Sequence, residues 1–176
     1  MNIIDYLGQE TPIGDSYERL KQNESTIFHL KDNFGEGNTN IYVLNKDQIN
    51  SFEDALVIQI LNDVMKYGNY LLTEYNEHEV LKLIMQELKE RYSEKFLENK
   101  ELNLSGQIAK YPKSRIKEIH KDYDWEVSIN YDDLFNQAWT KEKTIKSYTA
   151  KTDWNDEDYF FETENHFIRL NWGTGA

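Results

Sequence analysis

The sequence predicts an α+β fold, in which two central α-helices pack with an antiparallel β-sheet formed mainly by the C-terminal half. Two observations support this prediction. Apolar residues recur at helical spacing in the middle of the chain, and short alternating segments bounded by turn residues follow after residue 110. The chain has 176 residues, 14% of them aromatic, and only 2 Pro. Such a chain can bury one core, so we expect a single domain over residues 1–176.

The N-terminal part favours a hairpin preceded by a weak helix that ends near residue 24. The segments S-T-I-F-H-L (25–30) and I-Y-V-L (41–44) are typical of short strands, and the loop between them is rich in Gly and Asn. We therefore expect these two strands to pair.

Two longer helices are predicted after this hairpin. Ser51 followed by Asp54 resembles a capping box, and apolar residues then recur over 52–67. A second helix is expected to begin after Asn76 and to end near Leu97, because Val80, Ile84, Leu88 and Tyr92 form an i, i+4 stripe.

The C-terminal part is predicted to form most of the sheet. W-E-V-S-I-N-Y (125–131) alternates like a strand, R-I-K-E-I-H (115–120) is ambiguous, and 132–139 favours a short helix. Three further strands are expected over 144–151, 158–163 and 166–172, the last two joined by a tight turn at Glu164 and Asn165.

Side-chain alternation in the last predicted hairpin divides its rings between two faces. In 166–172, Ile168, Leu170 and Trp172 share one face, as a core face requires. In 158–163, Phe160 points one way whereas Tyr159 and Phe161 point the other. We therefore expect at least one of these rings to remain partly exposed.

Composition and charge exclude several classes of function. The absence of Cys excludes disulfides and thiolate metal sites, and no segment resembles a signal peptide or a membrane span. The net charge of −12 argues against direct binding to nucleic acid or to anionic membranes. We expect a cytoplasmic protein. Its net charge also has an ordinary explanation, because many cytoplasmic proteins are acidic for solubility alone.

No motif identifies a reaction, so we expect a protein that is not an enzyme, with no catalytic residue, resident metal or cofactor. H-E-V-L-K (78–82) lacks the second His of a zinc protease motif. One alternative is a metal-dependent enzyme that uses His120, Asp122 and Asp124, because these residues fall on one face of an extended segment.

Acidic and aromatic residues are interleaved in two segments. Asp153 to Glu164 holds six carboxylates and four aromatic residues with no Lys or Arg, and residues 122–133 repeat this pattern. Aromatic anchors set among charges are typical of protein-binding surfaces. The alternative is an ordinary acidic surface over an aromatic core. The predicted partner-binding residues are Asp153, Trp154, Asp156, Glu157, Asp158, Tyr159, Glu162, Glu164, Asp122, Tyr123, Asp124 and Trp125.

The C-terminal segment D-Y-F-F-E-T-E-N-H-F-I-R-L-N-W (158–172), in an acidic chain without Cys, resembles bacterial toxin-immunity proteins. The resemblance implies a stoichiometric inhibitor that neutralises a cognate protein toxin, such as a basic nuclease, by blocking its active site. Its carboxylates would mimic phosphates. An alternative with the same surface is a phosphate-mimicking regulator of a host nucleic-acid-binding protein. A subunit with a purely structural role is a further alternative.

Overall fold

The structure, a computed structural model, describes residues 26–31, 38–49, 51–67, 97–110, 117–120, 126–129, 134, 136–153 and 156–173. Within these residues the chain forms a mixed α+β fold built on one eight-stranded sheet, with the strand order β3-β6-β7-β8-β2-β1-β4-β5. Every pair of neighbouring strands is antiparallel. No helix in the described part of the chain is long and apolar enough to cross a membrane.

The sheet draws six of its eight strands from residues after Tyr67, so its predicted location is confirmed. The strands are β1 (Thr26–Lys31), β2 (Asn38–Asn45), β3 (Leu97–Glu98), β4 (Lys117–His120), β5 (Glu126–Ile129), β6 (Lys146–Asp153), β7 (Asp156–Glu162) and β8 (His166–Gly173). The helices are α3 (Phe52–Tyr67), α6 (Leu104–Ile108) and the 3₁₀ helix η1 (Ala138–Lys141).

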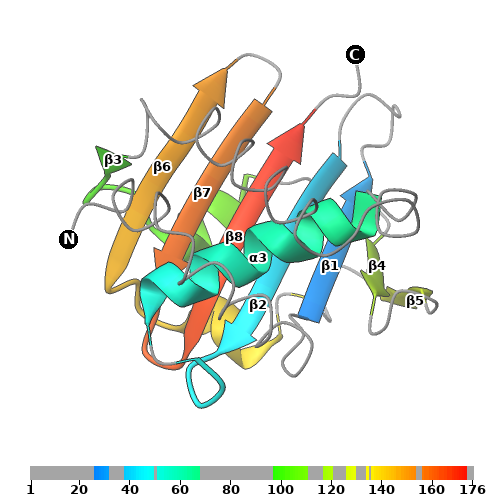
Figure 1. Ribbon diagram of the computed structural model, residues 1–176, viewed down its shortest axis with the longest axis horizontal. Coiled ribbons are helices and arrows are strands. Elements are labelled where there is room, and N and C mark those ends of the chain that lie inside the picture. Colours follow the sequence, from blue (N-terminus) through cyan, green and yellow to red (C-terminus); the bar gives the residue numbers. More distant parts are fainter. Residues whose placement is uncertain are drawn as a thin grey trace, which may run out of the picture.

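Helix α3 begins where its capping residue predicts. Ser51 Oγ accepts a hydrogen bond from the Asp54 amide at 3.1 Å, which satisfies one of the free donors of the first turn. The helix lies across one face of the sheet (Figure 1). All six residues from Ala55 to Ile60 are buried. Because six residues cover more than one and a half turns, this stretch has no solvent-exposed side.

Two sequence predictions fall partly or wholly outside the described residues. The weak N-terminal helix lies outside them, and so does the second central helix, except that Leu97, its expected end, begins strand β3. The helix predicted over 132–139 is confirmed only in part. Leu134 is α-helical, whereas residues 132, 133 and 135 lie outside the described part of the chain. Asn136 and Gln137 lie in a turn and a bend, and the 3₁₀ helix η1 begins at Ala138.

Both faces of the central strands are buried, which explains why the expectation of an exposed ring in β7 is wrong. Tyr159 and Phe161 join a cluster that includes Leu104 of α6 and Trp139 of η1. Phe160 points to the opposite face, the side of α3, and is 1% exposed. Alternation in a strand separates two faces but does not tell which of them meets solvent.

A buried ion pair lies on the α3 side of the sheet. The Arg169 guanidinium donates from Nε to Asp158 Oδ1 at 2.9 Å and from Nη2 to Oδ2 at 2.8 Å. Its Nη1 donates to the Gln59 carbonyl of α3 at 3.4 Å. Both charged side chains are almost completely buried, at 0% and 2% exposure. This bidentate pair therefore joins β7, β8 and α3 in the interior.

We expect Asp158→Asn to lower the free energy of unfolding by about 3–5 kcal/mol, because it leaves the Arg169 charge buried without its counter-charge. Urea unfolding measures this change. The matched control is Glu101→Gln, which alters an exposed acid and should change the free energy by less than about 0.5 kcal/mol. Replacing both partners, as Asp158→Leu with Arg169→Met, should cost less than Asp158→Asn alone. A loss below about 1 kcal/mol for Asp158→Asn would contradict this role.

Candidate functional site

The β6–β7 hairpin gathers acidic residues at one end of the sheet. Asp153 and Asp156 face each other in the β6–β7 ladder, and Glu157 follows directly. On the opposite face of the sheet, Glu157 pairs with Trp172 of β8. Asp156, Glu157 and Trp172 are all half-buried. We call Asp153, Asp156, Glu157 and Trp172 the acidic hairpin end, which lies at the top of the sheet in Figure 1.

Asp153 and Asp156 occupy paired positions in the β6–β7 ladder. Residues directly opposite in an antiparallel ladder are close neighbours, and opposing like charges are unfavourable there. The register therefore places two acidic positions side by side at the hairpin end. A cationic group bound there would reduce repulsion between them.

Glu157 is held in place by a tyrosine of the core. Burial, the charge of Glu157 and the hydrogen bond that the Tyr159 hydroxyl donates to Glu157 together raise the pKa of Tyr159 to about 12. The hydroxyl therefore remains a donor to the Glu157 carboxylate at neutral pH. This bond fixes an acid of the hairpin end on a side chain that is itself 5% exposed.

Two residues predicted to contact a partner are instead interior. Asp158 is 1% exposed because it pairs with Arg169, and Tyr159 packs in the core on the opposite face. Neither presents its side chain to a partner. The sequence prediction failed here because Arg169 faces Phe160 in the adjacent strand, two residues along β7 from Asp158 and on the same face, and this register is not visible in the order of residues.

The remaining acids do not form one continuous face with the hairpin end. Antiparallel strands rise about 3.4 Å per residue, so the six steps from Asp156 to Glu162 separate these residues by about 20 Å. Glu162 also pairs with Lys46 at 2.9 Å and with Lys146 at 3.5 Å. Glu164, in the β7–β8 turn, is exposed at this second end.

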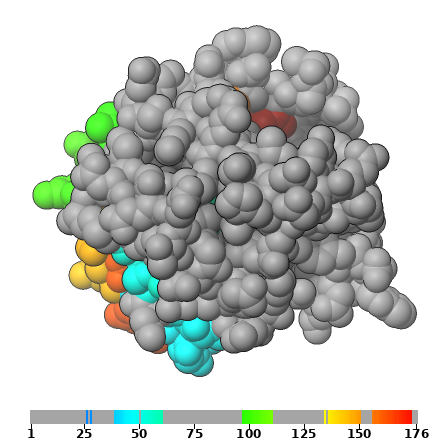
Figure 2. Space-filling model, viewed as in Figure 1, coloured from blue at the N-terminus to red at the C-terminus, as the bar shows by residue number. Residues whose placement is uncertain are grey.

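Figure 2 shows the α3 side of the molecule, where the described surface lies mainly along one margin. There the β2–α3 connection (cyan) adjoins orange residues of the C-terminal hairpin. The contact includes a hydrogen bond from the Lys46 amide to the Asn165 carbonyl at 2.8 Å. Glu162 and its two lysines belong to this end of the sheet.

The other predicted site residues lie outside the described part of the chain. These are Trp154 and the segment Asp122, Tyr123, Asp124 and Trp125. His120, the first residue of the alternative metal site, ends β4, and its two predicted carboxylate partners lie in that same segment. Among the described residues, no three His, Asp or Glu side chains gather as metal ligands would.

The β7–β8 turn contains a polar cluster that the sequence did not predict. Glu142 accepts hydrogen bonds from Thr163 Oγ1 at 2.6 Å, from the Asn165 amide at 3.1 Å and from Asn165 Nδ2 at 3.1 Å. His166 Nδ1 lies 3.0 Å from Glu142 Oε1. Glu142 lies 21 residues before Thr163 in the sequence, and its carboxylate binds the turn from outside the hairpin.

These donors determine the charge of Glu142. Burial acts to raise its pKa, but the hydrogen bonds from Thr163, Asn165 and His166 outweigh burial and lower the pKa to about 2. Glu142 is therefore an ionised acceptor at neutral pH. Because it cannot donate, His166 Nδ1 must carry the proton of their shared hydrogen bond.

Glu142→Gln should lower the free energy of unfolding by about 1–3 kcal/mol at pH 7, because it removes the charge from these hydrogen bonds. The folded pKa lies below the ordinary value of 4.5, so the stabilisation is complete above about pH 4.5 and is lost as the pH falls toward 2. Urea unfolding from pH 7 to pH 3 should show the two proteins converging. Glu164→Gln, in the same turn, is the control, and a pH-independent difference would argue against this account.

Comparison with protein-family models, with curated proteins and with solved structures found no match to this chain. The function is therefore argued from the geometry and charge of the chain itself.

Proposed function

We propose that the protein is a stoichiometric inhibitor of the immunity type, which binds a basic protein toxin and blocks its active site through the acidic hairpin end. The observation that carries the proposal is the register that pairs Asp153 with Asp156 at the end of the hairpin, with Glu157 as the next residue of β7. Three acidic positions at one end of the sheet would attract a cationic partner. The proposal implies a cytoplasmic, non-catalytic protein that uses no cofactor.

Charge supports fast and selective encounter with such a partner. The chain carries a net charge of −12, so a basic protein is attracted and nucleic acid is repelled. Complementary charges can raise association rate constants to about 10⁸–10⁹ M⁻¹s⁻¹ at low salt, against about 10⁵–10⁶ M⁻¹s⁻¹ without steering. At physiological salt, screening reduces such interactions over about 8 Å, so the local density of acids at the hairpin end matters more than the net charge.

Aromatic surface beside these acids would supply the anchoring contact. Trp172 faces Glu157 across the β7–β8 ladder and is half-buried, so part of its ring is available for contact. Tryptophan is the residue type most typical of binding hot spots, whereas charges set the encounter rate. Trp154, Tyr123 and Trp125, which lie outside the described residues, remain predicted anchors from the sequence.

Two alternatives predict different partners or ligands. A phosphate-mimicking regulator would use the same hairpin end against a host nucleic-acid-binding protein. A metal-dependent enzyme would use His120, Asp122 and Asp124, and it requires a metal that copurifies with the protein. The immunity-type proposal instead requires that the protein protect cells from the product of an adjacent gene.

The proposal is tested by expressing the product of the neighbouring open reading frame in a bacterial host with and without this protein. We expect growth arrest without it, rescue with it, and an equimolar complex by size-exclusion chromatography. A neighbour that is harmless, or that forms no complex, would reject the proposal.

Two matched charge variants then locate the surface. Asp156→Asn with Glu157→Gln should slow association about tenfold at low salt and reduce its salt dependence, as measured by stopped-flow fluorescence. Glu98→Gln with Glu101→Gln removes the same charge from exposed positions near β3 and should have a smaller effect. Trp172→Ala should mainly speed dissociation. Equal slowing by both charge pairs would exclude the hairpin end as the contact.

A further inference from the structure

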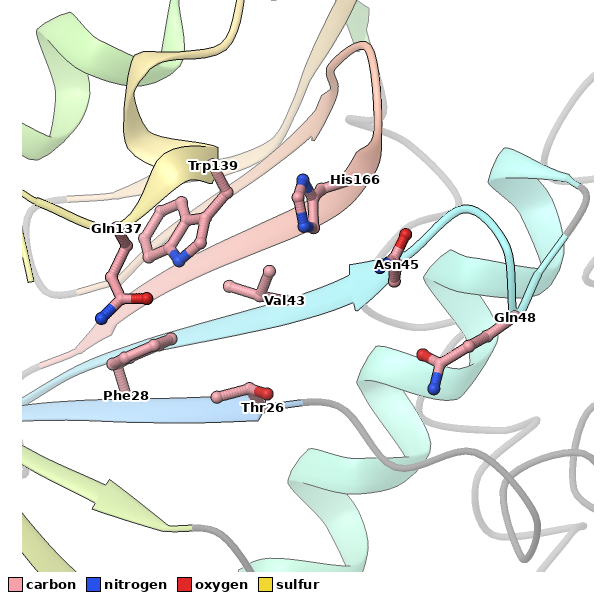
Figure 3. Close-up of a pocket in the computed structure, with 8 residues that line it drawn as sticks. All are labelled: Thr26, Phe28, Val43, Asn45, Gln48, Gln137, Trp139 and His166. Carbon is pink, nitrogen blue, oxygen red and sulfur yellow. The ribbon is translucent and has the colours of Figure 1, made fainter.

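A hollow of about 300 Å³ lies at the opposite end of β8 from the acidic hairpin end. Eight side chains line it: Thr26, Phe28, Val43, Asn45, Gln48, Gln137, Trp139 and His166. They come from β1, β2, the β2–α3 connection, the segment containing η1, and the first residue of β8 (Figure 3). A volume of this size is at the lower end of the range found for small-molecule sites.

Three apolar side chains of the core contribute to the floor of the hollow, whose accessible lining is mainly polar. Phe28, Val43 and Trp139 are 2%, 7% and 5% exposed. The rings of Phe28 and Trp139 lie 5.5 Å apart between centroids, tilted by 44°. Such packed side chains form a pre-organised surface that need not rearrange to receive a flat ligand.

The described polar side chains around this floor include no Asp, Glu, Lys or Arg. They are three carboxamides, from Asn45, Gln48 and Gln137, with the Thr26 hydroxyl, the Trp139 indole and the His166 imidazole. In Figure 3 the indole nitrogen and one nitrogen of the imidazole are directed toward the hollow above Val43. Among these described residues an ionic ligand would meet no carboxylate, ammonium or guanidinium as counter-charge, and a buried charge without a counter-charge is costly.

Glu142 fixes what His166 offers to the hollow. Its carboxylate accepts a hydrogen bond from His166 Nδ1 at 3.0 Å. The other ring nitrogen, Nε2, is not used by Glu142, and in the neutral ring it presents a lone pair. The Trp139 indole can only donate. The hollow thus offers an imidazole nitrogen and an indole donor above its floor, with three carboxamides at its margin.

We propose that this hollow binds an uncharged, planar heterocycle that carries both hydrogen-bond donors and acceptors, namely a nucleobase in the form of a nucleoside. The base would lie against the rings of Phe28 and Trp139 and present its polar edge to Trp139, His166 and the amides. The net charge of −12 disfavours the phosphorylated forms, and the described lining residues include no Lys or Arg to bind a phosphate. This site is independent of the acidic hairpin end and of the toxin proposal.

The test is titration calorimetry with adenosine, guanosine, cytidine and uridine and with their 5′-monophosphates. We expect at least one nucleoside to bind with a Kd between about 10 μM and 1 mM, as suits a ligand of this size in a small pocket. Its monophosphate should bind about tenfold more weakly. Absence of binding by all four nucleosides, or tighter binding of a monophosphate, would overturn the proposal.

Three variants assign the binding to this hollow. Trp139→Phe keeps a ring in the floor but removes the donor, and Gln137→Ala removes one amide; each should weaken binding about fivefold to tenfold. Asn136→Ala changes the exposed neighbouring residue, which does not line the hollow, and should leave Kd unchanged. Thermal unfolding checks that Trp139→Phe is folded. Unchanged affinity in both Trp139→Phe and Gln137→Ala would place the ligand elsewhere and reject the site.

Discussion

The buried pair of Arg169 and Asp158 is the interaction on which the architecture depends. The Arg169 guanidinium lies between two rings, 5.3 Å from the centroid of Tyr42 and 5.6 Å from that of Phe160, while its nitrogens bind Asp158 and the Gln59 carbonyl. The Gln59 amide in turn donates to the Tyr42 carbonyl at 3.2 Å and to the Phe167 carbonyl at 2.8 Å. Helix α3 is thereby tied to β2, β7 and β8 through polar contacts in a dry interior. Such contacts demand one orientation of the helix, whereas apolar packing alone tolerates several.

Features with a local physical cause could be predicted from the sequence. Helix α3 follows from its capping residue and apolar spacing, and the β7–β8 hairpin follows from two alternating segments around Glu164 and Asn165. Features that depend on distant partners could not be predicted. Asp158 looks like a surface acid until Arg169 is placed beside it, and Glu142 has no visible role until the β7–β8 turn folds against it. Helix α6 was missed because five residues, begun by the Asn103 cap, are too few for a periodic signal.

The acids of the C-terminal segment therefore have different physical roles although they look alike in the sequence. Asp158 neutralises a cation inside the protein, and Glu162 bridges two lysines at the margin. Asp153, Asp156 and Glu157 instead concentrate charge at the end of a hairpin. Because Asp158 is committed to the interior, its charge contributes little to the field outside. Any long-range attraction of a partner by this segment must come mainly from the hairpin end and from Glu164.

The same strand, β8, connects two regions of opposite chemical character. Near its end, Trp172 pairs with Glu157 at the acidic hairpin end. At its beginning, His166 is held by an ionised Glu142, yet the described residues that line the hollow there include no Asp, Glu, Lys or Arg. The Glu142 charge does not face that hollow as a free anion, because it already accepts four hydrogen bonds from the turn and from His166. A chain with a net charge of −12 can in this way keep a hollow whose described lining has no carboxylate, provided that each nearby carboxylate is satisfied by donors within the fold.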